Sequence, residues 1–94
     1  MTMELLPSEE IDRRLAGSAW RREGTAIARE LQLADFKEAL AFVDKVGELA
    51  ERANHHPDIL IHSYNRVRLT LSTHSAGGVT EADLNLAAEI DRLG

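Results

Sequence analysis

Residues 35–57 read DFKEALAFVDKVGELAERANHHP, and this stretch decides the fold. Its apolar residues recur at helical spacing and form a stripe that is wide enough to cover a sheet. Asp35, with Glu38 three residues later, matches an aspartate version of the capping box that opens a helix. Pro57 disfavours helical backbone at the residue before it, so the helix should end near residues 54–56. The stretch therefore predicts one long amphipathic helix.

The chain after this helix has the pattern of two strands, from Asp58 to Tyr64 and from Arg66 to His74, about a tight turn near Asn65. Successive side chains of a strand point to opposite faces of the sheet. In the second strand one face therefore carries Val67, Leu69, Leu71 and Thr73, and the other carries Arg66, Arg68, Thr70, Ser72 and His74. We expect the first of these faces to be buried.

A final helix is expected after the break in the chain at residues 76–78, which read Ala-Gly-Gly. Thr80 should cap this helix, with Asp83 at its third position completing a capping box. The helix carries the apolar residues Leu84, Ala87, Ala88, Ile90 and Leu93.

The chain before residue 35 has the pattern of a short helix followed by a hairpin. Ser8 is expected to be the N-cap of the helix, which should run to about Ala16 and stop at Gly17. Residues 19–33 contain an alternating stretch, and Glu23–Gly24 supplies a turn within it. The predicted order is thus αββαββα, with every connection compatible with antiparallel pairing. It indicates an α+β fold in which three helices pack on one face of a four-stranded antiparallel sheet.

Length and composition set the limits of this interpretation. The 94 residues make one domain, 1–94, that buries only about 60–65% of the surface of its unfolded chain, so association into oligomers is plausible. The absence of cysteine excludes disulfides, thiolate metal sites and cysteine nucleophiles. A net charge of −5 argues against nucleic-acid binding, which needs a positive surface.

The distribution of apolar residues indicates a cytoplasmic protein that does not enter the membrane. The first seven residues have no basic region followed by a long apolar stretch, as a signal peptide would. The longest uninterrupted apolar run covers residues 39–43, far below the roughly 20 residues that a membrane span needs.

The histidines form the pattern that is most suggestive of chemistry. His55 and His56 come at the end of the long helix, and His74 comes at the end of the last strand. Glu51 precedes His55 by four residues, so both are expected on the same side of the helix. The carboxylate and the negative end of the helix dipole would favour the imidazolium form. An imidazole that titrates near neutrality is a natural proton donor and acceptor.

Three interpretations of this cluster remain open from the residues alone. His55-His56-Pro57 could be a polar end of the helix without any chemistry. Several histidines and a glutamate could bind zinc, although no familiar zinc spacing is present. The third interpretation is acid–base catalysis.

A family resemblance bears on that choice. Glu51, three residues, His55-His56-Pro57, then Tyr64, nine residues, His74 and later Asp83 resemble the signature of the pterin-4a-carbinolamine dehydratases. The similarity runs from about Leu6 to Arg92, which is nearly the whole chain. Such enzymes remove water from 4a-hydroxytetrahydrobiopterin and give quinonoid dihydropterin, in the recycling of tetrahydropterin. The resemblance implies a lyase with a pterin substrate and with neither metal nor cofactor.

The resemblance also assigns roles to particular residues. The three active-site histidines of the family correspond to His55, His56 and His74, of which we assign His55 and His74 as the acid–base pair and His56 to orienting the pterin. Substrate-binding positions correspond to Glu51, Asn54, Trp20 and Asp83. Glu51 is expected to accept hydrogen bonds from the pterin or to orient His55.

Several of these residues also have a structural interpretation. Trp20 could belong to the core, and Asp83 to the capping box of the last helix. His62 lies outside the signature and is expected on the surface of a strand, and Tyr64 is expected to pack at a hairpin. The sequence departs from the family pattern at Asn54, where animal members often have aspartate, and at Ile59 and Ala82, where an aromatic residue and an arginine are frequent.

The resemblance implies partners as well as a substrate. Family members form dimers and tetramers, so a homodimer or homotetramer is expected. Other members act as a dimerisation cofactor of a transcription factor or resemble assembly factors of Rubisco. A non-catalytic interaction or assembly protein is therefore the alternative to the enzyme.

Overall fold

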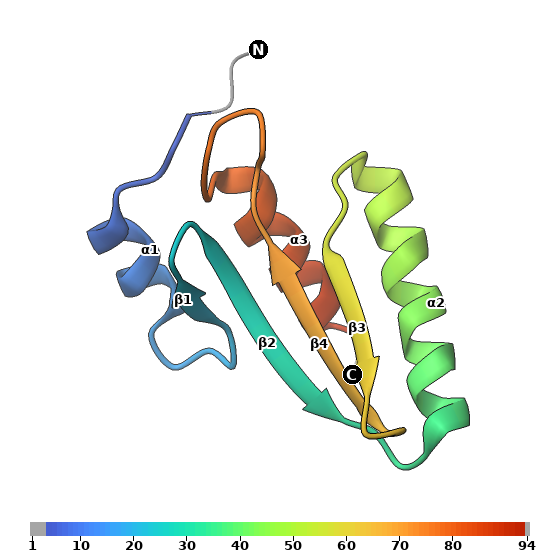
Figure 1. Cartoon of the computed structure of the whole chain (residues 1–94). Coiled ribbons are helices and arrows are strands. Elements are labelled where there is room, and N and C mark those ends of the chain that lie inside the picture. The colour runs from blue at the N-terminus through green and yellow to red at the C-terminus, as the bar shows by residue number, and fades with distance from the viewer. Residues whose placement is uncertain (1–3, 94) are drawn as a thin grey trace.

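The computed structural model describes residues 4–93 and has the predicted element order (Figure 1). A short helix and a hairpin are followed by a long helix, a second hairpin and a final helix. The elements are α1 (Ser8–Leu15), β1 (Arg21–Glu23), β2 (Ala26–Gln32), α2 (Phe36–Ala53), β3 (Asp58–His62), β4 (Arg66–Leu71) and α3 (Glu81–Asp91). This confirms the α+β fold and the order αββαββα.

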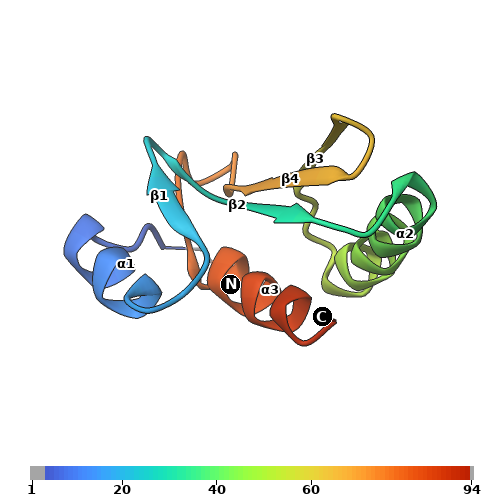
Figure 2. The ribbon, with the colours of Figure 1, turned by 90° about the horizontal axis from the view of Figure 1, so that it is seen from below.

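The four strands form one antiparallel sheet in the order β1-β2-β4-β3. The last strand in the sequence therefore lies inside the sheet, between two earlier ones, and β3 forms an edge. Val67 of β4 faces Leu31 of β2 on one side and Ile61 of β3 on the other. Seen from below, the three helices lie on the same side of the sheet, as predicted (Figure 2).

The core lies between this face of the sheet and the helices. Every second residue of β4 is buried, because alternate side chains point to the same face. Val67, Leu69 and Leu71 are fully buried, and Val46 of α2 and Ile90 of α3 pack in the same cluster. The expected buried face of β4 is confirmed, and it includes the polar residue Thr73, which follows the strand.

The two ends of α2 are fixed by different devices. At its start, the Asp35 carboxylate accepts a hydrogen bond from the Glu38 N–H, as the capping pattern predicted. At its end, Asn54 adopts the left-handed conformation, with φ 50° and ψ 42°. Asparagine is one of the few residues besides glycine that takes this conformation readily. The helix therefore ends before His55, whose N–H bonds back to the Ala50 carbonyl.

Some local predictions are wrong in detail. Ser8 is the first residue of α1 rather than its cap, since Pro7 occupies the N-cap position without a side-chain hydrogen bond. The strands of the second hairpin are shorter than expected, so Tyr64 and His74 lie outside them. Tyr64 does not pack at the hairpin: positive φ angles at Ser63 and Tyr64 form the turn and leave the Tyr64 side chain exposed.

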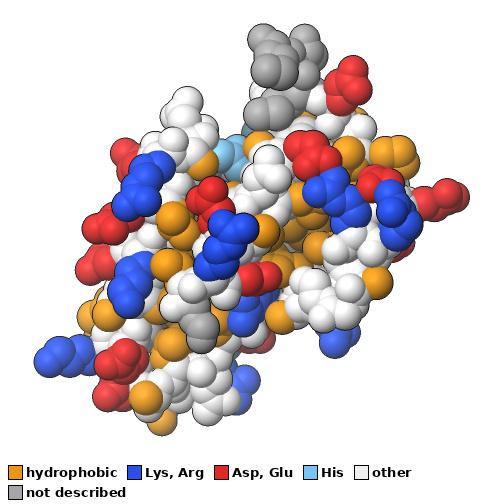
Figure 3. All heavy atoms as spheres, turned by 180° about the vertical axis from the view of Figure 1, so that it is seen from behind, with side chains coloured by type: hydrophobic (Ala, Val, Ile, Leu, Met, Phe, Trp, Pro, Cys, Tyr) orange, Lys and Arg blue, Asp and Glu red, His pale blue; other side chains and the backbone are white. Residues whose placement is uncertain are grey.

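The surface of the molecule mixes charges of both signs. On the face shown in Figure 3, basic and acidic side chains are interspersed. Several pairs link separate elements, including Arg14 with Glu81 and Arg22 with Asp12. The hydrogen bonds from Arg22 hold the pKa of Asp12 below its ordinary value. Within residues 4–93, no helix combines the length and the apolar character that crossing a membrane requires.

Candidate active site

The candidate residues lie where three elements begin or end. His55 and His56 follow the last turn of α2, His74 lies in the turn after β4, and Asp83 lies in the first turn of α3. Figure 1 shows these three points at the same end of the molecule. The fold thus brings together parts of the signature that are far apart in the sequence.

His55 and Asp83 form a partly buried pair. The His55 Nε2 and the Asp83 Oδ1 are 2.5 Å apart, and the side chains are 15% and 0% exposed. A fully buried carboxylate is costly without hydrogen-bond donors around it. An ionised carboxylate can only accept, so the proton between the two groups belongs to Nε2 of the imidazole. Asp83 therefore fixes the tautomer of His55 and leaves Nδ1 as the nitrogen with which a ligand could exchange a proton.

The second oxygen of Asp83 is held by two further donors. Oδ2 accepts from the Thr73 hydroxyl at 2.8 Å and from the Thr80 N–H at 2.9 Å. The Thr80 contact belongs to the predicted capping box of α3, which the structure contains. Asp83 therefore caps α3 with one oxygen, as expected, and binds His55 with the other, while its role in binding a substrate stays a prediction. This connection between a helix cap and a histidine could not be seen in the sequence.

Glu51 contacts His56, not His55 as expected from the four-residue spacing. The Glu51 Oε2 and the His56 Nε2 are 2.5 Å apart, and the side chains are 78% and 56% exposed. The prediction assumed that His55 belongs to the helix, where residues four apart share a face. Because Asn54 ends the helix in the left-handed conformation, His55 turns toward α3 and His56 takes the place beside Glu51.

His74 lies in an exposed turn whose backbone is well fixed. The turn is closed by hydrogen bonds from Gly77 N–H to the carbonyls of Thr73 and His74. Thr73, directly before His74, binds the same carboxylate as His55. His74 is therefore one residue away from the Asp83 network. Within residues 4–93 its ring makes no hydrogen bond, so its imidazole is open to a ligand.

Two other predicted binding residues have structural roles. Trp20 is buried in the core, and its indole Nε1 donates to the Asp91 carboxylate at 2.8 Å. Asp91 lies eight residues beyond Asp83, or about 12 Å along the axis of α3. The structure thus places Trp20 in the core, away from the His55 pair, and its role in binding stays a prediction. Asn54 is exposed and serves as the left-handed cap of α2.

A cavity of about 360 Å³ lies beside the His55 pair, between the end of α2 and α3. His55 is the one histidine among its lining residues, which are Ala53, His55, Glu81, Ala82, Asn85, Leu86 and Glu89. His56 and His74 do not line this cavity, so the three predicted histidines share one end of the molecule but not this hollow.

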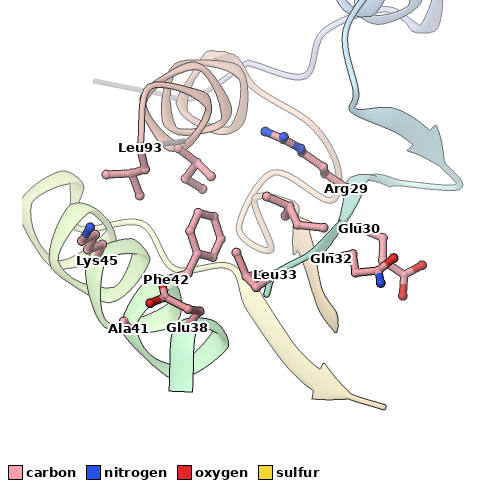
Figure 4. Close-up of a pocket in the computed structure, with 11 residues that line it drawn as sticks. Arg29, Glu30, Gln32, Leu33, Glu38, Ala41, Phe42, Lys45 and Leu93 are labelled. Carbon is pink, nitrogen blue, oxygen red and sulfur yellow. The ribbon is translucent and has the colours of Figure 1, made fainter. Parts of the chain in front are cut away.

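A larger cavity, of about 530 Å³, lies near the other end of α3 (Figure 4). The side chains of Phe42, Leu33 and Leu93 point into it, with Arg29 and Lys45 at its sides. None of the residues of the family signature lines it. By size this would be the first candidate for a binding site. The smaller cavity is the better candidate, because a histidine oriented by a buried carboxylate lines it.

Within residues 4–93, no three His, Asp or Glu side chains are grouped so that they could hold a metal ion. The fourth histidine, His62, lies in β3 and contacts Glu30 of β2. In the sheet, His62 pairs with Arg66 and Glu30 pairs with Arg68. These two arginines belong to the face of β4 that points away from the helices. His62 is therefore on the uncovered face of the sheet, where a surface strand residue was expected.

Fold and site together define an α+β protein with a histidine–aspartate pair and two further histidines at one end of a helix-covered sheet. A model of the pterin 4 alpha carbinolamine dehydratase family matches residues 4–93. The chain belongs to this family. It is 51% identical over 92 residues to a protein of Acidobacterium capsulatum provisionally named pterin-4-alpha-carbinolamine dehydratase, covering 97% of this chain and 99% of that one.

Other relatives and two solved structures agree with this assignment. A protein of Nocardia farcinica with the same provisional name is 51% identical and covers 99% of this chain and 98% of that one. The transcriptional coactivator/pterin dehydratase of Brucella melitensis is 34% identical, with a TM-score of 0.86, over 93% of this chain and 95% of that one. A pterin dehydratase-like RuBisCO assembly factor of the alpha-carboxysome is 27% identical, with a TM-score of 0.67, over 80% and 88%.

Proposed function

We propose that this protein is a hydro-lyase that dehydrates 4a-hydroxytetrahydropterins, with 4a-hydroxytetrahydrobiopterin as the expected substrate. The observation that carries the proposal is the pair of His55 with the fully buried Asp83. A surface histidine at the end of a helix needs no buried carboxylate. A histidine that must present one defined nitrogen to a substrate does, because the carboxylate selects the tautomer.

The reaction requires two proton movements. The C4a hydroxyl leaves as water after it receives a proton, and N5 loses a proton as the bond between N5 and C4a becomes double. Two imidazoles can carry out these steps, each contributing on the order of 10²–10⁴ in rate. His55 and His74 are the proposed pair. His56, which is held by Glu51, is proposed to bind and orient the pterin.

The groups on the two catalytic histidines support different roles. His55 has a carboxylate on Nε2, which fixes the orientation of its ring. His74 has no such partner among residues 4–93, so its ring can follow the ligand. Neither electrons nor groups other than water are transferred, so the proposed reaction uses no metal and no cofactor. Recycling of tetrahydropterin, a cytoplasmic location and a homodimer or homotetramer remain predictions that accompany the proposal.

The test is dehydration of enzymatically generated 4a-hydroxypterin, followed in the ultraviolet with and without the protein across pH. His55→Ala and His74→Ala should each lower kcat by about a hundredfold or more, because each removes one proton-transfer group. His62→Ala is the matched control, since it also removes a histidine paired with a carboxylate, but on the uncovered face of the sheet. Its kcat should equal that of the wild type. Wild-type rates in both the His55 and His74 variants would refute the proposal, provided that circular dichroism shows all variants folded.

A non-catalytic role is the second candidate. Its support is the similarity in fold to the pterin dehydratase-like assembly factor, at a TM-score of 0.67. This role requires a protein partner and gives no reason for an oriented histidine. A stoichiometric partner in a pull-down experiment, together with no measurable dehydration by the wild type, would favour it over the enzyme.

A further inference from the structure

We propose that Thr73 is a positioning residue for His55 and that it acts through Asp83. The inference rests on the proposed function for its kinetic consequence, but its structural basis is independent of any reaction. Thr73 is the polar exception in a buried row of apolar residues, since it continues the face of Val67, Leu69 and Leu71. A hydroxyl in such a place must find a partner, because burying it without one is costly.

The Thr73 hydroxyl belongs to a directed chain of hydrogen bonds. Its oxygen lies 2.8 Å from the Asp83 Oδ2 and 2.8 Å from the Thr80 Oγ1. The carboxylate can only accept, so Thr73 donates its single proton to Asp83. Thr73 must then accept from the Thr80 hydroxyl. Both threonines and the aspartate are buried. Water therefore does not compete for these groups, and their orientation is defined.

This chain joins three elements at the carboxylate. Thr73 follows β4, Asp83 and Thr80 belong to the start of α3, and His55 follows α2. The Thr80 N–H alone would connect Asp83 only to its own helix. The Thr73 hydroxyl is the donor that ties this carboxylate to the end of the sheet.

The hydrogen bonds on one oxygen of Asp83 determine where its other oxygen, Oδ1, points. With Oδ2 held by two donors from different elements, rotation of the carboxylate is restricted and Oδ1 points at His55. Loss of the Thr73 donor allows the carboxylate to turn, and the His55 proton is then no longer kept on Nε2. A small misplacement of a catalytic group can lower a rate by about a hundredfold. Thr73 therefore sets the tautomer of His55 without touching either the ring or the substrate.

The test replaces the hydroxyl and leaves the shape. Thr73→Val should lower kcat by about ten- to a hundredfold with KM within about twofold, because orientation rather than binding is lost. Thr73→Ser keeps the hydroxyl and should restore most of the rate. Thr70→Val is the matched control, since it makes the same change in β4 on the opposite face, and it should leave kcat unchanged. Equal losses in the Val and Ser variants at position 73 would overturn the proposal.

A readout that needs no activity separates this proposal from the proposed function. Imidazole ¹⁵N chemical shifts should show the His55 proton on Nε2 in the wild type and in Thr73→Ser, and both tautomers in Thr73→Val. An unchanged tautomer in Thr73→Val would overturn the positioning role, whether or not the protein dehydrates pterins. A changed tautomer in a protein without activity would instead reject the proposed function and leave the positioning role standing.

The route through Asp83 is tested by combining variants. In an Asp83→Asn background, Thr73→Val should change kcat by less than about twofold, because residues that act through one another are not additive. A full additional loss would show that Thr73 acts elsewhere and would overturn the proposal. If Thr73→Val does not fold, Thr73→Ala removes the same hydroxyl donor to Asp83. It should again give both tautomers of His55, and a single tautomer would overturn the proposal.

Discussion

The two histidine–carboxylate pairs at the end of α2 have the same length and opposite surroundings. In each, an Nε2 lies 2.5 Å from a carboxylate oxygen. The Asp83 side of one pair is closed to solvent, whereas most of the Glu51 side chain in the other is open to it. Charges in water are screened and attract weakly, while a buried charge depends on each of its partners. Distance alone therefore does not show which pair matters, and burial does.

The difference is also one of connections. Asp83 accepts hydrogen bonds from three donors: the His55 ring after α2, the Thr73 hydroxyl after β4 and the Thr80 N–H at the start of α3. Glu51 has one partner, five residues along the chain. A change at Asp83 therefore reaches two helices and the sheet, and a change at Glu51 stays local.

The largest effect is expected for Asp83→Asn. The substituted amide presents an N–H group where two hydrogen-bond acceptors are needed, so at least one of the three donors loses its partner. An unsatisfied buried group costs about 1–3 kcal/mol, so the free energy of unfolding should fall by at least that amount. The kcat should fall by about a hundredfold or more, because the tautomer of His55 is released. Urea unfolding and the pterin assay measure the two effects, and a variant as stable and as active as the wild type would show that burial does not distinguish the pairs.

A smaller effect is expected for Glu51→Gln. An exposed ion pair contributes about 0–1 kcal/mol, so the free energy of unfolding should change by no more than that. If Glu51 binds the pterin as predicted, KM should rise more than kcat falls. Glu30→Gln is the matched control, because it disrupts the similar pair with His62 on the uncovered face of the sheet. It should leave both kinetic constants unchanged, and a fall in stability as large as that of Asp83→Asn in either variant would contradict the comparison.

The smallest effect concerns the exposed pair of Asp12 with Arg22, which links α1 to β1. The hydrogen bonds from Arg22 lower the pKa of Asp12 from its ordinary value of 3.8. A carboxyl group with a lowered pKa in the folded state adds stability above its unfolded pKa, and this stability is lost as pH falls through the folded value. Asp12→Asn should therefore be slightly less stable than the wild type at pH 7 and equally stable in strong acid. Thermal unfolding at both pH values checks this, and a difference that persists in acid would assign the effect to another cause.

Local patterns were sufficient to predict the elements of the fold. The helical spacing in residues 36–53, the alternation in residues 66–73 and the capping residues Asp35 and Thr80 all appear as expected. Each of these signals acts between residues that are close in the sequence, where the spacing fixes which side chains share a face. The order β1-β2-β4-β3 is different in kind, because it depends on which strands meet after the chain has folded.

The structure shows where the candidate residues lie and which of them are paired, and their roles stay predictions. The resemblance selected His55, His56, His74, Glu51 and Asp83, and the structure gathers them at one end of the molecule. The pairing of Glu51 was wrong, because a single left-handed residue, Asn54, changed the direction of the chain. A left-handed cap is compatible with the sequence but is not required by it.

Thr73 was placed on the buried face but was not recognised as part of the site. The available signal was a hydroxyl at a core position, which implies a buried partner. That partner is Asp83, which lies ten residues further along the chain and in another element, so local spacing did not indicate it.

By itself, the sequence determined the type and order of the elements and the buried face of β4, because these follow from periodicity, capping and spacing along the chain. Its resemblance to a known family selected the histidines that merit study. Only the tertiary structure decided which carboxylate each histidine binds and which of the two is shielded from water. Those properties arise between segments that become neighbours when the helices close over the sheet, and shielding exists only once the core has formed.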